Sequence, residues 1–373
     1  MKNRFKILLF LLAILLIFEG CKKPFSPAIK DISSNVLVVE GLINSGSDST
    51  IIKLSRTTNV SEEQTSKPEI GATVTVESES NETIALAEKS SGSYISVGLN
   101  LNKAKKYRLR IKTLKDETYL SDFVEVKVAP PIDQLNWKVD GNRVNISLNT
   151  HDDTKNSNYY RWEYVETWIF YSAFESLFKW NGVAVVPRSL LNEGIFKCWG
   201  NEISSNILLG STAKLANDVI FENPITFVQS GSEKFTEKYS IIVKQYVLTK
   251  EAYQFWGELQ KNTESLGSIF DSQPSQLKGN IHNIANSAEP VLGFVSIGTT
   301  TEKRIYIDRT SLPPTFIIPR TDDCIEPVEI KPQDAKAYFE GGFNIPVDLG
   351  TGASRFCVDC TLRGTNRKPA FWP

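Results

Sequence analysis

The sequence predicts a mainly β protein with two β-sandwich (immunoglobulin-like) domains, the second carrying a long insertion, a helix and a Pro/Gly-rich C-terminal segment that wraps over it. Three observations predict this class. Short alternating segments recur at intervals of about 8–12 residues, separated by Gly, Ser and Asn. Pro130 and Pro131 interrupt the series, and a new alternating series begins after them. The apolar fraction of 41% and the charged fraction of 23% are those of a folded chain.

The first 21 residues have the layout of an export signal that ends at a cysteine. Three cations fall within residues 2–6, twelve apolar residues follow at 7–18, and Gly20 precedes Cys21. The apolar run is too short to cross a bilayer permanently. The pattern resembles a bacterial lipoprotein signal, which implies that residues 1–20 are removed and Cys21 is acylated. An ordinary secreted protein with a stray cysteine is the alternative.

Residues 21–35 are polar, contain two prolines and indicate a short tether between the lipid and the first domain. A single acyl chain holds a protein at a membrane only marginally, so stable anchoring needs several chains. Removing three cations and one carboxylate with residues 1–20 changes 42 basic and 43 acidic side chains to 39 and 42, a net charge of −3. That balance, without a clustered basic face, argues against a nucleic-acid partner.

Four further cysteines, Cys198, Cys324, Cys357 and Cys360, form an even set in an exported chain. Such a set indicates two disulfides, and three pairings are open. One alternative is a zinc site, although only one CxxC pair and two solitary histidines are present. The other is a redox CxxC, although the residues after Cys360 do not predict a helix. Structural disulfides are the favoured interpretation, and we predict no metal and no cofactor.

The first sandwich is expected over residues 36–129. Residues 72–77 (ATVTVE) alternate Val74 and Val76 with polar residues, which is the period of a half-buried strand. Further β segments are predicted at 36–40, 50–54, 83–87, 92–97, 107–112 and 119–128. The succession of GATVTVESE, SGSYISVGL and KKYRLRIKT resembles the transthyretin-like or carboxypeptidase-regulatory-like sandwich, which implies a small N-terminal β module.

The second sandwich is expected over residues 132–310. Alternating apolar residues at 135–139 and 144–148 flank an Asp-Gly-Asn turn, a hairpin that resembles the start of a fibronectin type III or immunoglobulin-like domain. Residues 172–230 lack a clear period and are interpreted as an insertion that carries Cys198. Insertions of such length inside a sandwich are more often functional than not.

The most aromatic part of the chain is residues 159–180, with ten aromatic side chains in 22 residues. On a strand, Tyr160, Trp162, Tyr164 and Trp168 share one face. We favour a core strand, because one face of a sandwich strand packs into the interior and aromatic rings bury large areas. The alternative is a stacking platform of these four side chains for a sugar or a peptide.

Residues 239–249 alternate again and predict a central strand. Thr249 is a suitable N-cap for a helix predicted at 250–263, in which apolar residues recur at helical spacing. That stripe is interpreted as a contact with the core. Segments 291–297 and 304–308 are interpreted as a hairpin that closes the second sandwich.

The C-terminal segment, residues 311–373, holds eight of the seventeen prolines and five glycines. Such density excludes long helices and central strands. One short helix is predicted at 332–340, with proline in its first turn and glycine after its end. Three of the four cysteines lie here, where disulfides would substitute for a weak hydrophobic core. Phe371 and Trp372 suggest a chain end that docks in a groove.

Six stretches follow one another along the chain: LVVEG (37–41), YYRWEY (159–164), SIFDSQPSQLKGNIHN (268–283), VLGF (291–294), CVDC (357–360) and PAFWP (369–373). Together they resemble the domain-of-unknown-function 4249 family (DUF4249) of Bacteroidota lipoproteins. The resemblance implies a lipid-anchored protein of the cell envelope and outer membrane, commonly found beside TonB-dependent β-barrel receptors. It implies no catalytic residues.

The first functional hypothesis is an outer-membrane binding or accessory lipoprotein that helps a TonB-dependent receptor to take up a nutrient. The ligand, which could be a small molecule, a peptide or a glycan, and the membrane face stay open. The alternative is a structural or adhesion lipoprotein of the envelope. A hydrolase is disfavoured because no GxSxG, HExxH or Gly-rich phosphate motif is present, and the pairs Asp152-Asp153 and Asp322-Asp323 are of a kind that is usually solvated. We therefore predict no catalytic residue.

Overall fold

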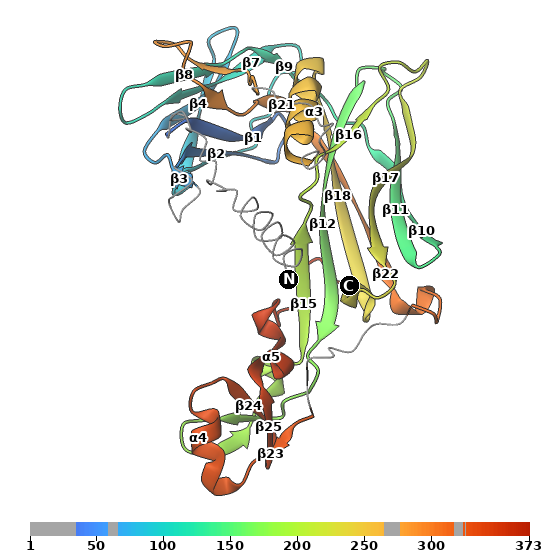
Figure 1. The fold of residues 1–373 in the computed structure, drawn as a ribbon. Coiled ribbons are helices and arrows are strands. Elements are labelled where there is room, and N and C mark those ends of the chain that lie inside the picture. Colours follow the sequence, from blue (N-terminus) through green and yellow to red (C-terminus); the bar gives the residue numbers. More distant parts are fainter. Residues whose placement is uncertain (1–34, 59–65, 265–276, 317–323, 325) are drawn as a thin grey trace, which may run out of the picture.

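The computed structural model describes residues 35–58, 66–264, 277–316, 324 and 326–373. Within these residues the chain is mainly β, as predicted, and forms two β domains and a smaller C-terminal module (Figure 1). The signal sequence, the tether before residue 35 and Cys21 lie outside the described residues, so their roles stay predictions. Among the described residues, none of the helices has the length and hydropathy that a bilayer-spanning segment needs.

The first domain is a nearly closed sheet around one core. Its strands are β1 (Leu37–Asn44), β2 (Ser49–Thr57), β3 (Ser66–Pro68), β4 (Thr73–Ser78), β5 (Thr83–Ser90), β6 (Ser93–Val97), β7 (Lys106–Lys112), β8 (Thr118–Ser121), β9 (Val124–Glu125), β19 (Ile281–Asn283), β20 (Val291–Leu292) and β21 (Ser296–Gly298). The main strand order is β19-β8-β7-β4-β5-β6-β2-β1-β20, and the two end strands contact one another. The predicted alternation is confirmed in β4, where Val74 and Val76 are buried in the core between more exposed neighbours.

Residues 281–298 belong to this first domain, so the predicted boundaries of the second sandwich, 132–310, and its closing hairpin at 291–297 are wrong. β19 pairs antiparallel with β8, and β20 and β21 pair parallel with β1. The physical reason is burial, because Val291, Val295 and Ile297 complete the first core. Gly293 has a φ of +131°, and a Cβ there would lie 2.1 Å from the Val39 carbonyl oxygen, so only glycine fits this approach.

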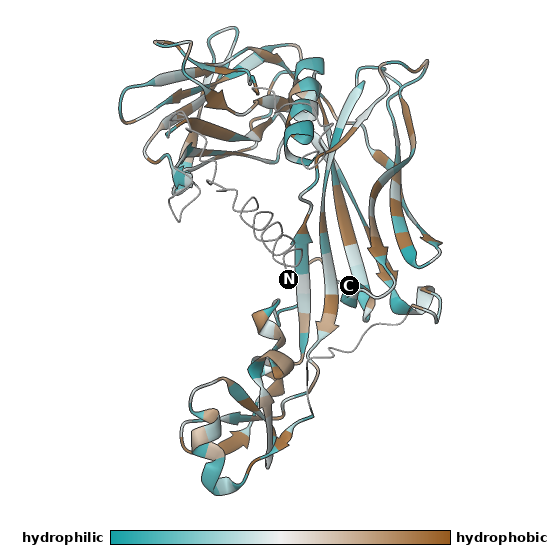
Figure 2. Ribbon diagram, viewed as in Figure 1, coloured by the Kyte–Doolittle hydropathy of each residue, from teal (hydrophilic) through white to brown (hydrophobic). Residues whose placement is uncertain are grey.

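The second domain is a sandwich of a three-stranded and a five-stranded sheet. One sheet has the order β10-β11-β17, and the other has β15-β12-β18-β22 with β16 paired to β12. The strands are β10 (Ile132–Asp140), β11 (Arg143–His151), β12 (Tyr159–Tyr171), β15 (Lys197–Ile203), β16 (Leu208–Ser211), β17 (Val219–Gln229), β18 (Lys238–Val247) and β22 (Thr300–Asp308). The predicted opening hairpin is β10–β11, and Figure 2 shows hydrophobic and hydrophilic residues in alternation along it and along β17. The shared core takes its side chains from both sheets.

The predicted insertion at 172–230 is too long. Only residues 172–196 leave the sandwich, and we call this segment the excursion. It forms β13 (Phe178–Trp180), β14 (Val185–Pro187) and the short helix α2 (Leu190–Glu193). Residues 197–229 return to it as β15, β16 and β17, which pair with β12 and β11. The alternation was not visible in the sequence because β17 pairs through two register irregularities and exposes Phe221 and Phe227.

Helix α3 (Lys250–Glu264) confirms the helix predicted at 250–263 and joins the two domains. Thr249 caps it, since its Oγ1 accepts a hydrogen bond from the Ala252 amide at 3.2 Å. One side of the helix lies on the five-stranded sheet through the ring pair Tyr159–Tyr253, whose centroids are 5.0 Å apart. Phe255 packs on Phe294 of the first domain, with ring centroids 5.4 Å apart. The helix therefore lies between the two domains (Figure 1).

The C-terminal module lies at the end of the second domain that is remote from the first (Figure 1). Its three-stranded sheet has the order β23-β25-β24, and the predicted helix at 332–340 is a 3₁₀ turn followed by α4. The elements are β23 (Val328–Glu329), η3 (Pro332–Asp334), α4 (Ala335–Phe339), β24 (Asn344–Asp348), β25 (Thr351–Ser354), α5 (Arg355–Val358) and η4 (Cys360–Leu362). β24 also contacts β13 of the excursion, so two distant segments build one module. Beyond it, Trp372 is buried against Tyr306 of β22, with ring centroids 5.8 Å apart.

Candidate functional site

The aromatic residues of β12 form the core of the second sandwich, and the stacking-platform hypothesis is wrong. Tyr160 and Trp162 have no exposed surface, Trp168 is 9% exposed, and Tyr164 packs against the same core. The polar tips are also satisfied inside: Tyr160 Oη donates to Asp218 at 2.9 Å, and Trp162 Nε1 donates to Gln245 Oε1 at 2.9 Å. No ring of this set is free to receive a sugar or a peptide.

The four candidate cysteines form two disulfides, Cys198–Cys360 and Cys324–Cys357. Cys357 and Cys360 of the CxxC motif therefore belong to different disulfides, which contradicts the redox and zinc alternatives for these residues. The first disulfide joins η4 to β15 of the sandwich, and the second closes the C-terminal module on itself. In the part of the chain that the structure describes, no group of three or more His, Cys, Asp or Glu side chains is placed to hold a metal ion.

The acidic pair Asp152-Asp153 organises a loop. Asp152 accepts hydrogen bonds from the amides of Thr154 at 2.9 Å and Asn156 at 3.2 Å. Partial burial opposes ionisation of Asp152, but these hydrogen bonds prevail and lower its pKa. Asp153 is exposed and faces His151 at 3.7 Å. The pair therefore serves the loop structure, and the other predicted pair, Asp322-Asp323, lies outside the described residues.

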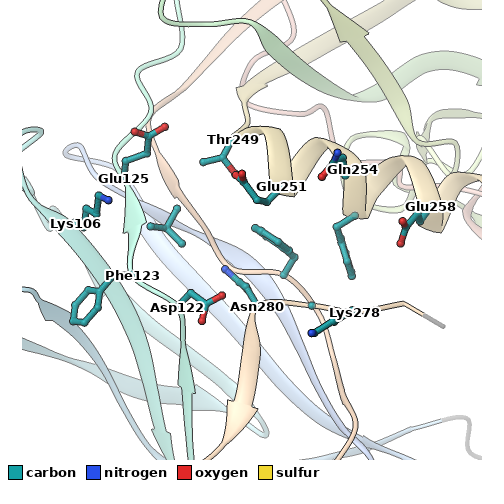
Figure 3. A pocket seen from close by; sticks show the side chains of 14 residues that line it. Lys106, Asp122, Phe123, Glu125, Thr249, Glu251, Gln254, Glu258, Lys278 and Asn280 are labelled. Atoms are coloured by element: carbon teal, nitrogen blue, oxygen red, sulfur yellow. The ribbon is translucent and has the colours of Figure 1, made fainter. Parts of the chain in front are cut away.

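A groove of about 590 Å³ lies between the first domain and helix α3 (Figure 3). One wall is the helix face with Glu251, Gln254 and Glu258, whose spacing of three or four residues places them on one side. The opposite wall belongs to the first domain and comes from the start of β7, the loop before β9, β9 itself and the segment before β19. Its side chains are Lys106, Asp122, Phe123, Val124, Glu125, Lys278 and Asn280.

Two contacts hold the walls of this α3 groove in place. Asn280 forms a pair of hydrogen bonds with the Val295 backbone, donating to its carbonyl at 2.9 Å and accepting from its amide at 2.8 Å. The Phe255–Phe294 ring pair joins the helix to the first domain at the base of the groove. Asn280 and Phe255 are buried, so these contacts fix the two walls relative to one another.

The α3 groove is polar at its rim and negative in balance. Asp122, Glu125, Glu251 and Glu258 contribute four carboxylates, and Lys106 and Lys278 contribute two ammonium groups. Figure 3 shows these charged side chains around the aromatic ones. The hydroxyl of Thr249 already accepts the helix-capping hydrogen bond. The lining thus offers hydrogen-bond acceptors over an apolar base, which suits binding, and it contains no Ser, Cys or Thr activated by a neighbouring base.

Sequence reasoning did not find this groove, because its walls come from segments about 130 and 150 residues apart in the chain, such as Asp122, Glu251 and Lys278. The one signal available was the polar face of the predicted helix. That face carried Glu251, Gln254 and Glu258, but a solvated helix face shows the same pattern.

A family model described as "Domain of unknown function (DUF4249)" matches residues 22–304. The chain belongs to this family. The matched range contains the first domain, helix α3 with its groove, and the second sandwich up to the middle of β22, whereas the C-terminal module follows it. The predicted family is therefore confirmed. A comparison with curated proteins gave no match.

Two solved structures show a distant likeness to this DUF4249 chain. One is a candidate carbohydrate-binding protein from Bacteroides uniformis, 9% identical, with 58% of this chain and 91% of that chain covered and a TM-score of 0.14. The other is a DUF3823 family protein from Bacteroides ovatus, 10% identical, with 57% and 90% covered and a TM-score of 0.15. At such scores neither likeness carries an argument about fold or function.

Proposed function

We propose that this DUF4249 protein is a lipid-anchored binding protein of the outer membrane that assists a TonB-dependent β-barrel receptor in nutrient uptake. The observation that carries the proposal is the α3 groove, an open cavity between the first domain and helix α3 whose described lining offers hydrogen-bond acceptors over an apolar base. The export signal that ends at Cys21 supports the anchor. The family resemblance supports the receptor as partner.

The size and lining of the α3 groove support a small ligand or one short segment of a larger one. A volume of about 590 Å³ lies within the range of roughly 300–1,000 Å³ that is usual for ligand sites. The four carboxylates against two ammonium groups favour a ligand that carries positive charge or many hydrogen-bond donors. Because the carboxylates are exposed to solvent, their attraction is screened by salt and acts mainly on orientation and encounter.

Metabolic labelling and receptor capture test this proposal in the native membrane. Cells supplied with radiolabelled fatty acid should incorporate label into the wild-type protein and none into Cys21→Ser. Cross-linking in intact membranes, followed by detergent extraction, should recover a TonB-dependent receptor with the wild-type protein. Label that persists in Cys21→Ser contradicts the anchor, and recovery of no β-barrel receptor contradicts the partnership.

A charge-reversal pair tests the groove itself. Glu251→Lys with Glu258→Lys changes the groove by four charge units, whereas Glu326→Lys with Glu329→Lys makes the same change on the exposed surface of the C-terminal module. We expect the groove variant to lower uptake of the nutrient that the captured receptor transports, with the module variant at the wild-type level. Equal uptake by both variants would contradict a role for the groove.

A further inference from the structure

A second cavity, of about 600 Å³, lies where the excursion after β12 meets the C-terminal module, remote from the α3 groove. The excursion contributes Lys179, Trp180 and Arg188. The module contributes Phe339, Arg355 and Asp359, among others. We name this space the module cavity. It is built from two segments about 160 residues apart, which the Trp180–Phe339 ring pair holds together with centroids 6.2 Å apart.

The charges that line the module cavity are paired except at one position. Lys179 pairs with Glu193, and Arg355 Nε pairs with Asp359 at 2.9 Å. Glu340 has Lys336 at 3.8 Å. Among the described residues, Arg188 has no carboxylate within 4 Å of its guanidinium, although the cavity is lined by three cations and three anions.

The carboxylates nearest to Arg188 are already engaged. Glu193 also accepts a hydrogen bond from the Ser189 amide at 3.2 Å, and Asp359 accepts one from the Thr361 amide at 3.0 Å. Burial lowers the pKa of Arg188, and the more distant charges of Glu193 and Asp359 only partly oppose this. Arg188 is therefore a half-buried cation that keeps its desolvation cost and lacks a bound counter-charge.

The guanidinium of Arg188 is held in place by neutral acceptors and keeps unused donors. Nε donates to Ser176 Oγ at 3.3 Å, Nη1 to the Glu193 carbonyl at 3.4 Å, and Nη2 to the Phe178 carbonyl at 3.1 Å. A guanidinium has five N–H groups, so one remains on each terminal nitrogen. Two such N–H groups form the fork that binds a carboxylate through both of its oxygens.

Trp180 supplies an apolar wall to the same space. Its ring lines the cavity beside Phe339 and offers an apolar surface to a ring or chain of a ligand.

We propose that the module cavity binds a small ligand through a carboxylate group, which the free N–H groups of Arg188 hold while the rest of the ligand lies against the ring of Trp180. A carboxylate supplies the counter-charge that Arg188 lacks, whereas a neutral ligand does not. The ligand class is an acidic sugar or a small organic acid, and both share this group. The site is separate from the α3 groove and does not depend on its function.

Titration calorimetry of the full chain in detergent tests the proposal with two matched pairs of probes. Sodium glucuronate is compared with glucose, and sodium benzoate with benzyl alcohol, because each pair differs in the carboxylate. We expect the acid of at least one pair to bind about ten- to a hundredfold more tightly than its neutral partner. Preference for glucuronate assigns an acidic sugar, and preference for benzoate assigns an organic acid. Equal binding within both pairs, or no binding of either acid, overturns the proposal.

Variants locate the binding in the module cavity. Arg188→Gln should abolish the preference for the acid, and Arg188→Lys, which keeps the charge and removes the fork of N–H donors, should weaken the binding of the acid by a few fold. The groove variant Glu251→Lys with Glu258→Lys should bind the acid like the wild type. If Arg188→Gln loses its melting transition, Arg188→Lys decides alone. Acid binding that is unchanged in Arg188→Lys and in any folded Arg188→Gln places the ligand elsewhere and overturns the proposal.

Discussion

The second sandwich and the C-terminal module of the same chain are stabilised in different ways. The sandwich buries a continuous core of aromatic and aliphatic side chains between its two sheets, including Trp162 and Phe170. The module buries few large side chains, chiefly Phe339 and Val358, and leaves Leu191 of the adjoining excursion 93% exposed and Phe343 82% exposed. The module is instead held by two disulfides, both within the described part of the chain. Apolar burial holds the first region, and covalent links hold the second.

Because the two regions are stabilised differently, different changes should destabilise them. Loss of a core side chain should unfold the sandwich and everything attached to it, because a packed core responds as a unit. Reduction of a disulfide should loosen the module alone, because the sandwich core contains only the Cys198–Cys360 pair at its edge. The predictions below test this separation, beginning with the largest effect.

Trp162→Ala should have the largest effect on the free energy of unfolding. The side chain is fully buried, stacks on Tyr160 at a centroid distance of 5.8 Å and donates to Gln245. Its removal leaves a cavity and an unpaired amide, and the expected loss is about 3–5 kcal/mol. Denaturant unfolding followed by tryptophan fluorescence measures it. As a control, Trp162→Phe keeps most of the apolar volume and should cost about 1–3 kcal/mol for the unpaired Gln245 oxygen. A loss below 1 kcal/mol for the alanine variant would contradict the core assignment.

The double variant Cys324→Ser with Cys357→Ser should have the next largest effect, confined to the module. The disulfide closes a segment with a sequence separation of 33, for which loop entropy predicts a stabilisation of about 3–4 kcal/mol. Limited proteolysis should cut the variant within residues 326–358 and leave the sandwich intact, and the main melting transition should stay unchanged. Simultaneous digestion of the sandwich would show that the two regions are not separate.

A buried ion pair gives a third, smaller effect within the sandwich. The carboxylate of Glu166 is almost fully buried and accepts from Lys234 Nζ at 2.7 Å and from Tyr239 Oη at 2.6 Å. Burial opposes the charge of Lys234, but its bonds to Glu166 and Glu202 prevail and raise its pKa. Lys234→Met leaves the buried carboxylate without its cation and beside the carboxylate of Glu202. It should cost about 2–3 kcal/mol, less than for a fully buried pair because solvent reaches the Lys234 end of the pair.

The double variant Glu166→Gln with Lys234→Met provides the control, because it removes both charges. Chemical denaturation should show that it recovers part of the loss of Lys234→Met. If the loss in the double variant equals or exceeds the sum of the losses in the two single variants, the pair is not coupled as proposed. The C-terminal module should be equally resistant to protease in all three variants.

Strand alternation predicted those parts of the fold in which one face of a strand is buried. β4 and β11 follow the predicted pattern closely, since each alternates buried and more exposed residues. The same reasoning found the β segment at 291–297 but assigned it to the wrong domain. Strands β20 and β21, of two or three residues, contain no period that identifies their partner, and that partner, β1, lies near the start of the chain. Such pairing depends on which core the residues complete, and a sequence window contains no information about a distant partner.

Neither cavity was predictable for a related reason. The carboxylates of the α3 groove belong to surface patterns that a solvated helix or loop shows equally well. In the module cavity, Arg188 is informative only because its neighbours are engaged elsewhere, and that is a property of the folded structure. By contrast, the count of four cysteines did indicate two disulfides, although it left their pairing open until the fold placed Cys198 beside Cys360.

The smallest predicted effect is a pH dependence of the sandwich near the first domain. His151 Nδ1 lies 2.7 Å from Asp133, and Asp153 and Asp152 face the same ring, so the hydrogen bond to Asp133 and these charges raise the pKa of His151. A raised pKa means that the folded state binds the proton more tightly. The stabilisation is therefore complete below the unfolded pKa of about 6.5 and disappears as the pH rises through the folded value.

Asp133→Asn should accordingly lower the melting temperature of the sandwich at pH 5 and leave it unchanged at pH 9. The difference should be small, because the His151 ring is exposed to solvent and screened. The titration of His151 can be followed by NMR, and we expect its midpoint to fall in the variant. An equal loss of melting temperature at both pH values would assign the effect of Asp133 to packing. The C-terminal module should be equally resistant to protease in the wild type and in Asp133→Asn, because the disulfides that hold the module do not titrate.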